Sequence, residues 1–232
     1  MKYLGSKNRI SKHILPIMNK ERGDRTWVEP FVGGANMIDK VDGQRIGSDM
    51  NEYVIALLNE MSKPDFNAPK INEEKYNDIK SNIDKYDKWI VGYAGTQLSF
   101  GATWFGSYRR DKQGKRDYCK EARNNVNKQS KNIQGIHFIH SDYMSLDIPD
   151  NSLIYCDPPY DTKATKGKYK DEFDHETFWN WCRQKSKEGH VVFVSEYNAP
   201  DDFKCVWEKE ISQRVNNNTK TKKANEKLFI IK

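Results

Sequence analysis

Residues 28–36, with the sequence VEPFVGGAN, join a short apolar segment to two adjacent glycines. The pattern around them predicts a strand over 26–31 and a short helix over 35–41. Gly33 and Gly34 fall between these elements, where a side chain would obstruct a ligand that approaches the backbone closely. Because paired glycines also form tight strand-to-helix turns without any ligand, this stretch alone does not establish a cofactor site.

Strands and helices alternate on either side of this stretch. Apolar periodicity predicts helices over 7–19, 52–61 and about 177–187. It predicts further strands over 45–48, 136–141, 153–156, 191–195, near 205–211 and near 227–231. This alternation is typical of an α/β protein, with a parallel sheet that carries helices on both faces.

The middle of the chain, residues 63–131, interrupts this alternation. It contains Pro64, Pro69, a helical pattern over 73–100 and a segment rich in glycine and aromatic residues. We therefore expect 1–62 and 132–232 to form one domain, and 63–131 to form an inserted, mainly helical lobe. Within the lobe, aromatic residues flank the turn sequence DKQG, which predicts a basic hairpin over 99–118.

Composition limits the class of protein. The 232 residues are 36% hydrophobic and 12% aromatic, which is enough to build a core. No apolar run approaches the ~18 residues that span a bilayer, and the start MKYLGSKNRI lacks the apolar centre of a signal peptide. We therefore expect a cytoplasmic protein. Its four scattered cysteines form no C-x-x-C pair, which predicts reduced thiols and no bound metal.

Positive charge is concentrated in two segments of a chain whose formal net charge is +6. Residues 107–131 carry nine basic residues against three acidic ones, and residues 214–232 carry six against one. A single charged run is usually a solvated surface. Because Tyr108 and Tyr118 lie within the first run and Trp104 and Phe105 lie just before it, a polyanion partner is the functional alternative.

A second candidate ligand group follows the strand predicted over 45–48. The sequence SDMN at 48–51 places Asp49 at the end of that strand, about twenty residues after the first strand. A carboxylate in this position can accept hydrogen bonds from ribose hydroxyls. The glycine stretch does not match G-x-G-x-x-G, so a nicotinamide cofactor is not favoured.

Residues 152–161, SLIYCDPPYD, end a buried strand abruptly with two prolines, which neither a helix nor a paired strand accommodates. The Asp157 carboxylate and the Pro158 carbonyl could accept both N–H groups of an exocyclic amine, while Tyr160 stacks on the base. These acceptors would stabilise the positive charge that develops as the nitrogen attacks an electrophilic methyl group. The structural alternative is a proline turn with a capping aspartate.

Four motifs in this order resemble the Dam-like DNA adenine methyltransferases, which use S-adenosylmethionine. The motifs are KYLGSK at 2–7, EPFVGGA at 29–35, SDMN and DPPY. The resemblance implies a Rossmann-like methyltransferase sheet, and it covers most of the chain outside the inserted lobe. This sequence has Ala35 where related loops often carry a third glycine.

The resemblance also implies roles for particular residues. Tyr3 and Lys7 would lie against the methionine part of the cofactor, with Lys7 near its carboxylate. Asp142, in HSDY at 140–143, would lie near the cofactor's adenine. The predicted cofactor-binding set is Tyr3, Lys7, Glu29, Phe31, Gly33, Gly34, Asp49, Asp142 and Asp157, and the predicted catalytic set is Asp157, Pro158 and Tyr160.

In this family the inserted lobe recognises the target sequence, which implies a DNA-binding role for the basic hairpin. Arg109 and Arg110 could read guanine edges or contact phosphates, and the sequence does not separate these roles. The loop over 161–174 would close over the extruded base. The predicted DNA-binding residues are Tyr108, Arg109, Arg110, Lys112, Lys115, Arg116, Lys220, Lys222 and Lys223.

These patterns together predict a site-specific DNA adenine methyltransferase that acts on a flipped-out adenine in double-stranded DNA. We expect a monomer without metal or membrane attachment, in the cytoplasm of a bacterial or phage-infected cell. The alternatives are an RNA adenine methyltransferase with the same chemistry, and a catalytically silent DNA-binding module that retains the fold. Cytosine amino-methylation is less favoured, because that related group tends to carry serine in place of Asp157. His175 is expected in the first turn of a helix rather than as a base.

Overall fold

The computed structural model describes residues 1–111, 113–160, 173–213 and 222–231, without the side chains of 102, 211–213 and 222–224. The chain divides into two compact units. The first consists of Met1–Ser11 and Val32–Leu146, and the second of Lys12–Phe31 and Asp147–Lys232.

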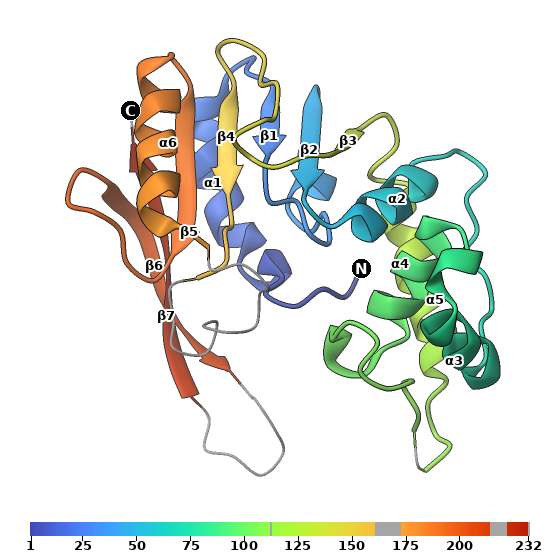
Figure 1. The fold of residues 1–232 in the computed structure, drawn as a ribbon. Coiled ribbons are helices and arrows are strands. Elements are labelled where there is room, and N and C mark those ends of the chain that lie inside the picture. The colour runs from blue at the N-terminus through green and yellow to red at the C-terminus, as the bar shows by residue number, and fades with distance from the viewer. Residues whose placement is uncertain (112, 161–172, 214–221, 232) are drawn as a thin grey trace. The chain divides into compact units, whose positions relative to one another are not determined.

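The predicted α/β class is confirmed. The seven strands found in the described residues have the sheet order β3-β2-β1-β4-β5-β7-β6 (Figure 1). Their bounds are β1 Trp27–Glu29, β2 Arg45–Asp49, β3 His137–His140, β4 Leu153–Cys156, β5 Val191–Glu196, β6 Lys204–Gln213 and β7 Lys222–Ile231.

The first unit combines a parallel strand pair with a group of helices (Figure 1). Strand β2 pairs with β3 in a register that sets Asp49 opposite His140. The helices are α2 Glu52–Met61, α3 Glu73–Ser81, α4 Lys88–Gln97 and α5 Tyr118–Ser130. Helices α2 and α4 pack closely at Gly92, where a Cβ atom would lie 2.1 Å from the carbonyl oxygen of Tyr53. The chain therefore needs glycine at this crossing.

The second unit is built on three parallel strands, β1, β4 and β5. Strands β4 and β5 are buried at every position, as expected for central strands with both faces covered. Strand β7 runs antiparallel to both β5 and β6, which makes the sheet mixed rather than wholly parallel. Helices α1 Ser11–Arg22 and α6 His175–Lys187 complete this unit.

Most predicted elements lie where the sequence placed them. Helix α2 and strand β4 have the predicted bounds, and Asp174 caps α6 by accepting a hydrogen bond from the N–H of Thr177 at 3.0 Å. This cap confirms that His175 lies in the first helical turn. The pattern over 73–100 forms two helices, α3 and α4, with the short 3-10 helix Ile83–Lys85 between them.

Two helices near the amino terminus differ from the prediction. The helix predicted over 7–19 is a 3-10 turn, Lys7–Arg9, followed by α1 from Ser11. The helix predicted over 35–41 is reduced to the 3-10 turn Ile38–Lys40. The second difference follows from Ala35, because its φ of 53° is left-handed and cannot start a right-handed helix.

The hairpin predicted over 99–118 is also corrected. The DKQG turn exists, since the N–H of Gly114 donates to the carbonyl of Asp111 at 3.1 Å. However, the strand pairing found in the described part of this segment is one bridge, Ser99 to Tyr108, which lies before that turn. The Asp111 carboxylate accepts the N–H groups of Lys115 and Arg116, both at 2.9 Å, so these groups do not pair across a hairpin.

The division into 1–62 with 132–232 and a lobe over 63–131 stays a prediction, because the two compact units have different boundaries. Helices α3, α4 and α5 all fall within 63–131.

Among the residues that the structure describes, no helix is long and apolar enough to cross a bilayer.

Candidate active site

The glycine stretch of the first unit is packed against Tyr3. A Cβ atom on Gly33 would lie 2.6 Å from Tyr3 Cε1, and one on Gly34 would lie 2.6 Å from Tyr3 Cβ. Real Cβ atoms do not approach other atoms so closely, so the side chain of Tyr3 already requires glycine at both positions. The sequence pattern indicated a close approach to this backbone, and the structure shows that a side chain of the same chain makes one.

Asp49 is fixed at the end of β2 by two backbone donors. Its Oδ2 accepts the N–H of Gly33 and its Oδ1 accepts the N–H of Asn51, both at 2.9 Å. Burial raises the pKa of the Asp49 carboxyl, and these two hydrogen bonds oppose that shift. Each carboxylate oxygen can accept a further hydrogen bond, which leaves capacity for hydroxyl donors of a ligand.

Asp142 follows strand β3, which pairs with the strand that ends in Asp49. The register sets Asp49 opposite His140, and Asp142 follows two residues later. Its Oδ1 accepts the N–H of Met144 at 2.8 Å. Lys7 is 8% exposed, and its Nζ donates to the carbonyl of Gly5 at 3.1 Å.

Sequence reasoning missed two apolar residues at these strand ends. Met50 and Met144 are 69% and 57% exposed, and each lies within two residues of a predicted ligand-binding acid. Exposed methionines offer an adaptable apolar surface for a flat ring. The available signal was a methionine one residue after the acid in SDMN and two residues after it in SDYM.

The DPPY motif belongs to the second unit and follows β4 directly. The Tyr160 hydroxyl donates to Glu226 Oε2 on β7 at 2.8 Å, and its ring meets that of Tyr197 edge-on at 4.7 Å. Burial, followed by the charges of Asp157 and Glu226, raises the pKa of Tyr160 far above its usual range. The phenol therefore remains protonated at neutral pH and acts as a hydrogen-bond donor.

Glu29 and Phe31, at the end of β1, have structural partners in the second unit. The Glu29 carboxylate accepts the indole N–H of Trp27 at 2.8 Å and is 3% exposed. The Phe31 ring packs edge-on against Phe173 and Phe178, with centroids 5.9 and 5.7 Å away.

The basic residues around position 110 make local contacts. Arg109 is 9% exposed and lies 4.4 Å above the ring of Tyr118. Tyr108 donates its hydroxyl to the carbonyl of Ile71 at 3.0 Å. The side chains of Arg110 and Arg116 are exposed and form ion pairs with Glu73 at 2.7 Å and with Glu121 at 2.8 Å.

Lys115 is exposed, whereas the remaining basic residues of the prediction cannot be placed. Lys112 and Lys220 lie outside the described residues, as does most of the loop over 161–174, and the side chains of Lys222 and Lys223 are not described.

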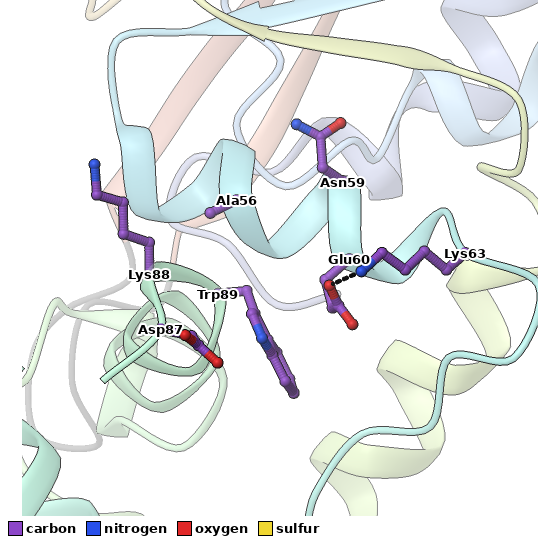
Figure 2. A pocket seen from close by; sticks show the side chains of 7 residues that line it. All are labelled: Ala56, Asn59, Glu60, Lys63, Asp87, Lys88 and Trp89. Carbon is purple, nitrogen blue, oxygen red and sulfur yellow. Dashed lines mark hydrogen bonds and ion pairs between the residues drawn. The ribbon is translucent and has the colours of Figure 1, made fainter. Parts of the chain in front are cut away.

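A groove of about 680 Å³ in the first unit lies beside α2 and the start of α4, and Figure 2 shows the side chains around it. An ion pair between Lys63 and Glu60, with an N···O distance of 2.6 Å, lies at one end. None of the predicted site residues lines it; its lining is Ala56, Asn59, Glu60, Lys63, Asp87, Lys88 and Trp89.

In the parts of the chain that the structure describes, no group of three or more His, Cys, Asp or Glu side chains could hold a metal ion.

Residues 3–227 match the model of the D12 class N6 adenine-specific DNA methyltransferases, and the chain belongs to that family. The family membership inferred from the four motifs is thereby confirmed.

Individual relatives are more distant. The chain is 25% identical over 212 residues to the Type II methyltransferase M.FokI of Planomicrobium okeanokoites, covering 79% of this chain and 31% of that protein. The chain thus spans about a third of the length of this relative. It is also similar to the solved structure of a candidate methyltransferase from Thermoplasma acidophilum, with 12% identity, a TM-score of 0.38, and coverage of 94% of this chain and 74% of that one.

The Tyr3 contact predicts a measurable coupling with Gly33. Gly33→Ala is expected to lower the free energy of unfolding by about 1–3 kcal/mol more in the wild-type chain than in Tyr3→Ala, because only the wild type has a ring that the new methyl group meets. Urea unfolding of the two single variants and the double variant measures this difference.

Gly135→Ala is the matched control, because Gly135 has a left-handed φ of 72° and no neighbour that an added Cβ would meet. Gly135→Ala should lower the free energy of unfolding by the same amount in the wild-type chain and in Tyr3→Ala. If Gly33→Ala lowered the free energy of unfolding equally in both backgrounds, the Tyr3 ring would not be what requires glycine at position 33.

Proposed function

We propose that this chain is a site-specific DNA adenine methyltransferase. It transfers a methyl group from S-adenosylmethionine to the exocyclic amino group of an adenine flipped out of double-stranded DNA. The observation that carries the proposal is the DPPY motif, which follows a buried central strand and is anchored through Tyr160 to Glu226, in a chain of this family. The DNA substrate, a monomeric state and a cytoplasmic location are parts of the same proposal.

The residues of the first unit fit the chemical groups of S-adenosylmethionine. Asp49 offers acceptors for ribose hydroxyls, and Lys7 offers a cation for the methionine carboxylate. Met50 and Met144 offer apolar contact to the adenine ring, and Asp142 an acceptor for its amino group. When bound, S-adenosylmethionine supplies a methyl group on a sulfonium, which makes that carbon electrophilic.

Asp157 and Pro158 act on the target amine. Their carboxylate and carbonyl oxygens accept its two N–H groups, which orients the nitrogen lone pair and stabilises the positive charge that forms on nitrogen. No strong base is needed beforehand, because the proton leaves after the nitrogen has become cationic. The Tyr160 ring stacks on the target adenine. Its neutral hydroxyl group bonds to Glu226 and so holds the motif in place.

Basic side chains provide the contacts to DNA phosphates. In this proposal Arg110, Lys115 and Arg116 serve that role together with Lys112, Lys220, Lys222 and Lys223. Arg109 and Tyr108 hold this segment in place, since Arg109 packs on Tyr118 and Tyr108 bonds to Ile71.

The ribose role of Asp49 predicts both an affinity loss and a pH dependence. Asp49→Ala should weaken S-adenosylmethionine binding by roughly 2–4 kcal/mol, because two charge-assisted hydrogen bonds are lost. Since burial raises the pKa of this carboxyl, it protonates at a higher pH than an ordinary aspartate. Affinity should therefore fall as the pH is lowered through that raised pKa. Calorimetric titration across pH measures both effects.

The stability of the free chain should respond to pH with the opposite sign. A carboxyl with a raised pKa stabilises the folded state in its protonated form, and this contribution is lost as the pH rises through the raised pKa. Asp49→Asn is the control, because it cannot titrate and should remove the contribution of this carboxyl from both profiles. Unchanged affinity in a folded Asp49→Ala chain would contradict the assignment.

The proposed reaction is tested by separating turnover from DNA binding. Asp157→Ala should remove most methyl transfer from labelled S-adenosylmethionine into duplex DNA. DNA affinity, measured by fluorescence anisotropy, should be largely preserved because phosphate contacts dominate it. Asp157→Asn, which keeps the size of the side chain, shows how much depends on the charge. Loss of DNA binding in parallel with activity would make Asp157 a structural residue and contradict the mechanism.

A further inference from the structure

The loop that follows β1 contains an alanine in a conformation that alanine avoids. Ala35 has a φ of 53°, and its side chain is fully buried. The left-handed region is unfavourable for a residue with a Cβ atom, which comes too close to the following carbonyl oxygen. Something in the surrounding structure must therefore hold the loop in this path.

Gln129, near the end of α5, makes the contacts that hold it. Its Nε2 lies 3.0 Å from the carbonyl oxygen of Gly34 and 3.0 Å from that of Ala35. The same nitrogen lies 3.0 Å from Asp39 Oδ2, which orients the amide. The side chain is 4% exposed, so these hydrogen bonds are shielded from water. One buried amide thus bonds both carbonyls around the strained residue.

A second buried glutamine holds the segment that packs on the same loop. Gln97, the last residue of α4, accepts the N–H of Lys2 at 3.0 Å and donates to the carbonyl of Lys2 at 2.9 Å. This pairing of both backbone groups fixes the residue before Tyr3, whose ring lies against Gly33 and Gly34. Gln97 is 2% exposed, and its amide also bonds to Thr96.

We propose that Gln129 is a positioning residue for the cofactor, acting through the backbone of Gly34 and Ala35, with Gln97 in a supporting role through Tyr3. This inference rests on the proposed function, because it takes the loop to be part of the S-adenosylmethionine site. Both glutamines come from residues 63–131, the segment expected to recognise the target. The segment therefore has a second task, which is to hold the cofactor loop in its binding conformation.

The test uses Gln129→Met, which keeps the length of the side chain and removes both hydrogen bonds to the loop. S-adenosylmethionine affinity, measured by calorimetry, should fall about tenfold or more, as expected for two hydrogen bonds. The turnover number at saturating cofactor should change much less than KM, because Gln129 contacts no reacting atom.

Ala35→Gly distinguishes positioning from a general packing role. Glycine adopts the left-handed conformation without strain, so adding Ala35→Gly to Gln129→Met should restore part of the lost affinity. A packing defect at the end of α5 would not respond to this change. Ser130→Ala is the matched control, since Ser130 is equally buried at the same helix end and bonds to Asn127 rather than to the loop.

Wild-type affinity in Gln129→Met, no recovery with Ala35→Gly, or an equal loss in Ser130→Ala would each overturn the inference. If Gln129→Met does not fold, Gln129→Asn is the milder variant, and the same partial recovery by Ala35→Gly is expected. A wild-type chain that folds but does not bind S-adenosylmethionine would instead contradict the proposed function.

Discussion

The packing of Tyr3 against Gly33 and Gly34 is the constraint on which the organisation of the first unit depends. It leaves no room for a Cβ atom at either position and so dictates the two glycines. The N–H of Gly33 is then bonded by Asp49, which connects the loop to the end of β2. The strand pairing of β2 with β3 in turn sets the position of Asp142. Tyr3, Gly33, Gly34, Asp49 and the strand that precedes Asp142 are thus connected through direct contacts.

In the second unit, the DPPY motif contains two prolines and needs an anchor other than strand pairing. Pro158 and Pro159 have no backbone N–H and cannot be anchored by strand pairing. The Tyr160 hydroxyl replaces that anchor with a hydrogen bond to Glu226 on β7. Because Glu226 is 8% exposed and the phenol is held neutral, this bond is shielded from water. The antiparallel strand β7 therefore supports the motif that follows β4.

The sequence predicted the secondary-structure elements that a local pattern determines. It did not predict the side-chain contacts between residues that are far apart in the chain. Helix α2 and strand β4 were predicted with their observed bounds, because periodicity and flanking breakers determine both. The contacts of Gln97, Gln129 and Glu226 join residues far apart in the sequence, and no local signal reveals them. The prediction of a hairpin over 99–118 was wrong because the Asp111 side chain bonds to backbone N–H groups that a hairpin would pair.

The most direct test of the proposed reaction is the identity of the methylated nucleoside. Duplex DNA and structured RNA are incubated separately with the chain and with S-adenosylmethionine that carries a deuterated methyl group, and the digested nucleosides are analysed by mass spectrometry. We expect deuterated N6-methyladenine from the duplex DNA, and its absence when Asp157→Ala replaces the wild type. Label found in cytosine, found in RNA but not in DNA, or found in neither would contradict the assignment of this chain as a DNA adenine methyltransferase.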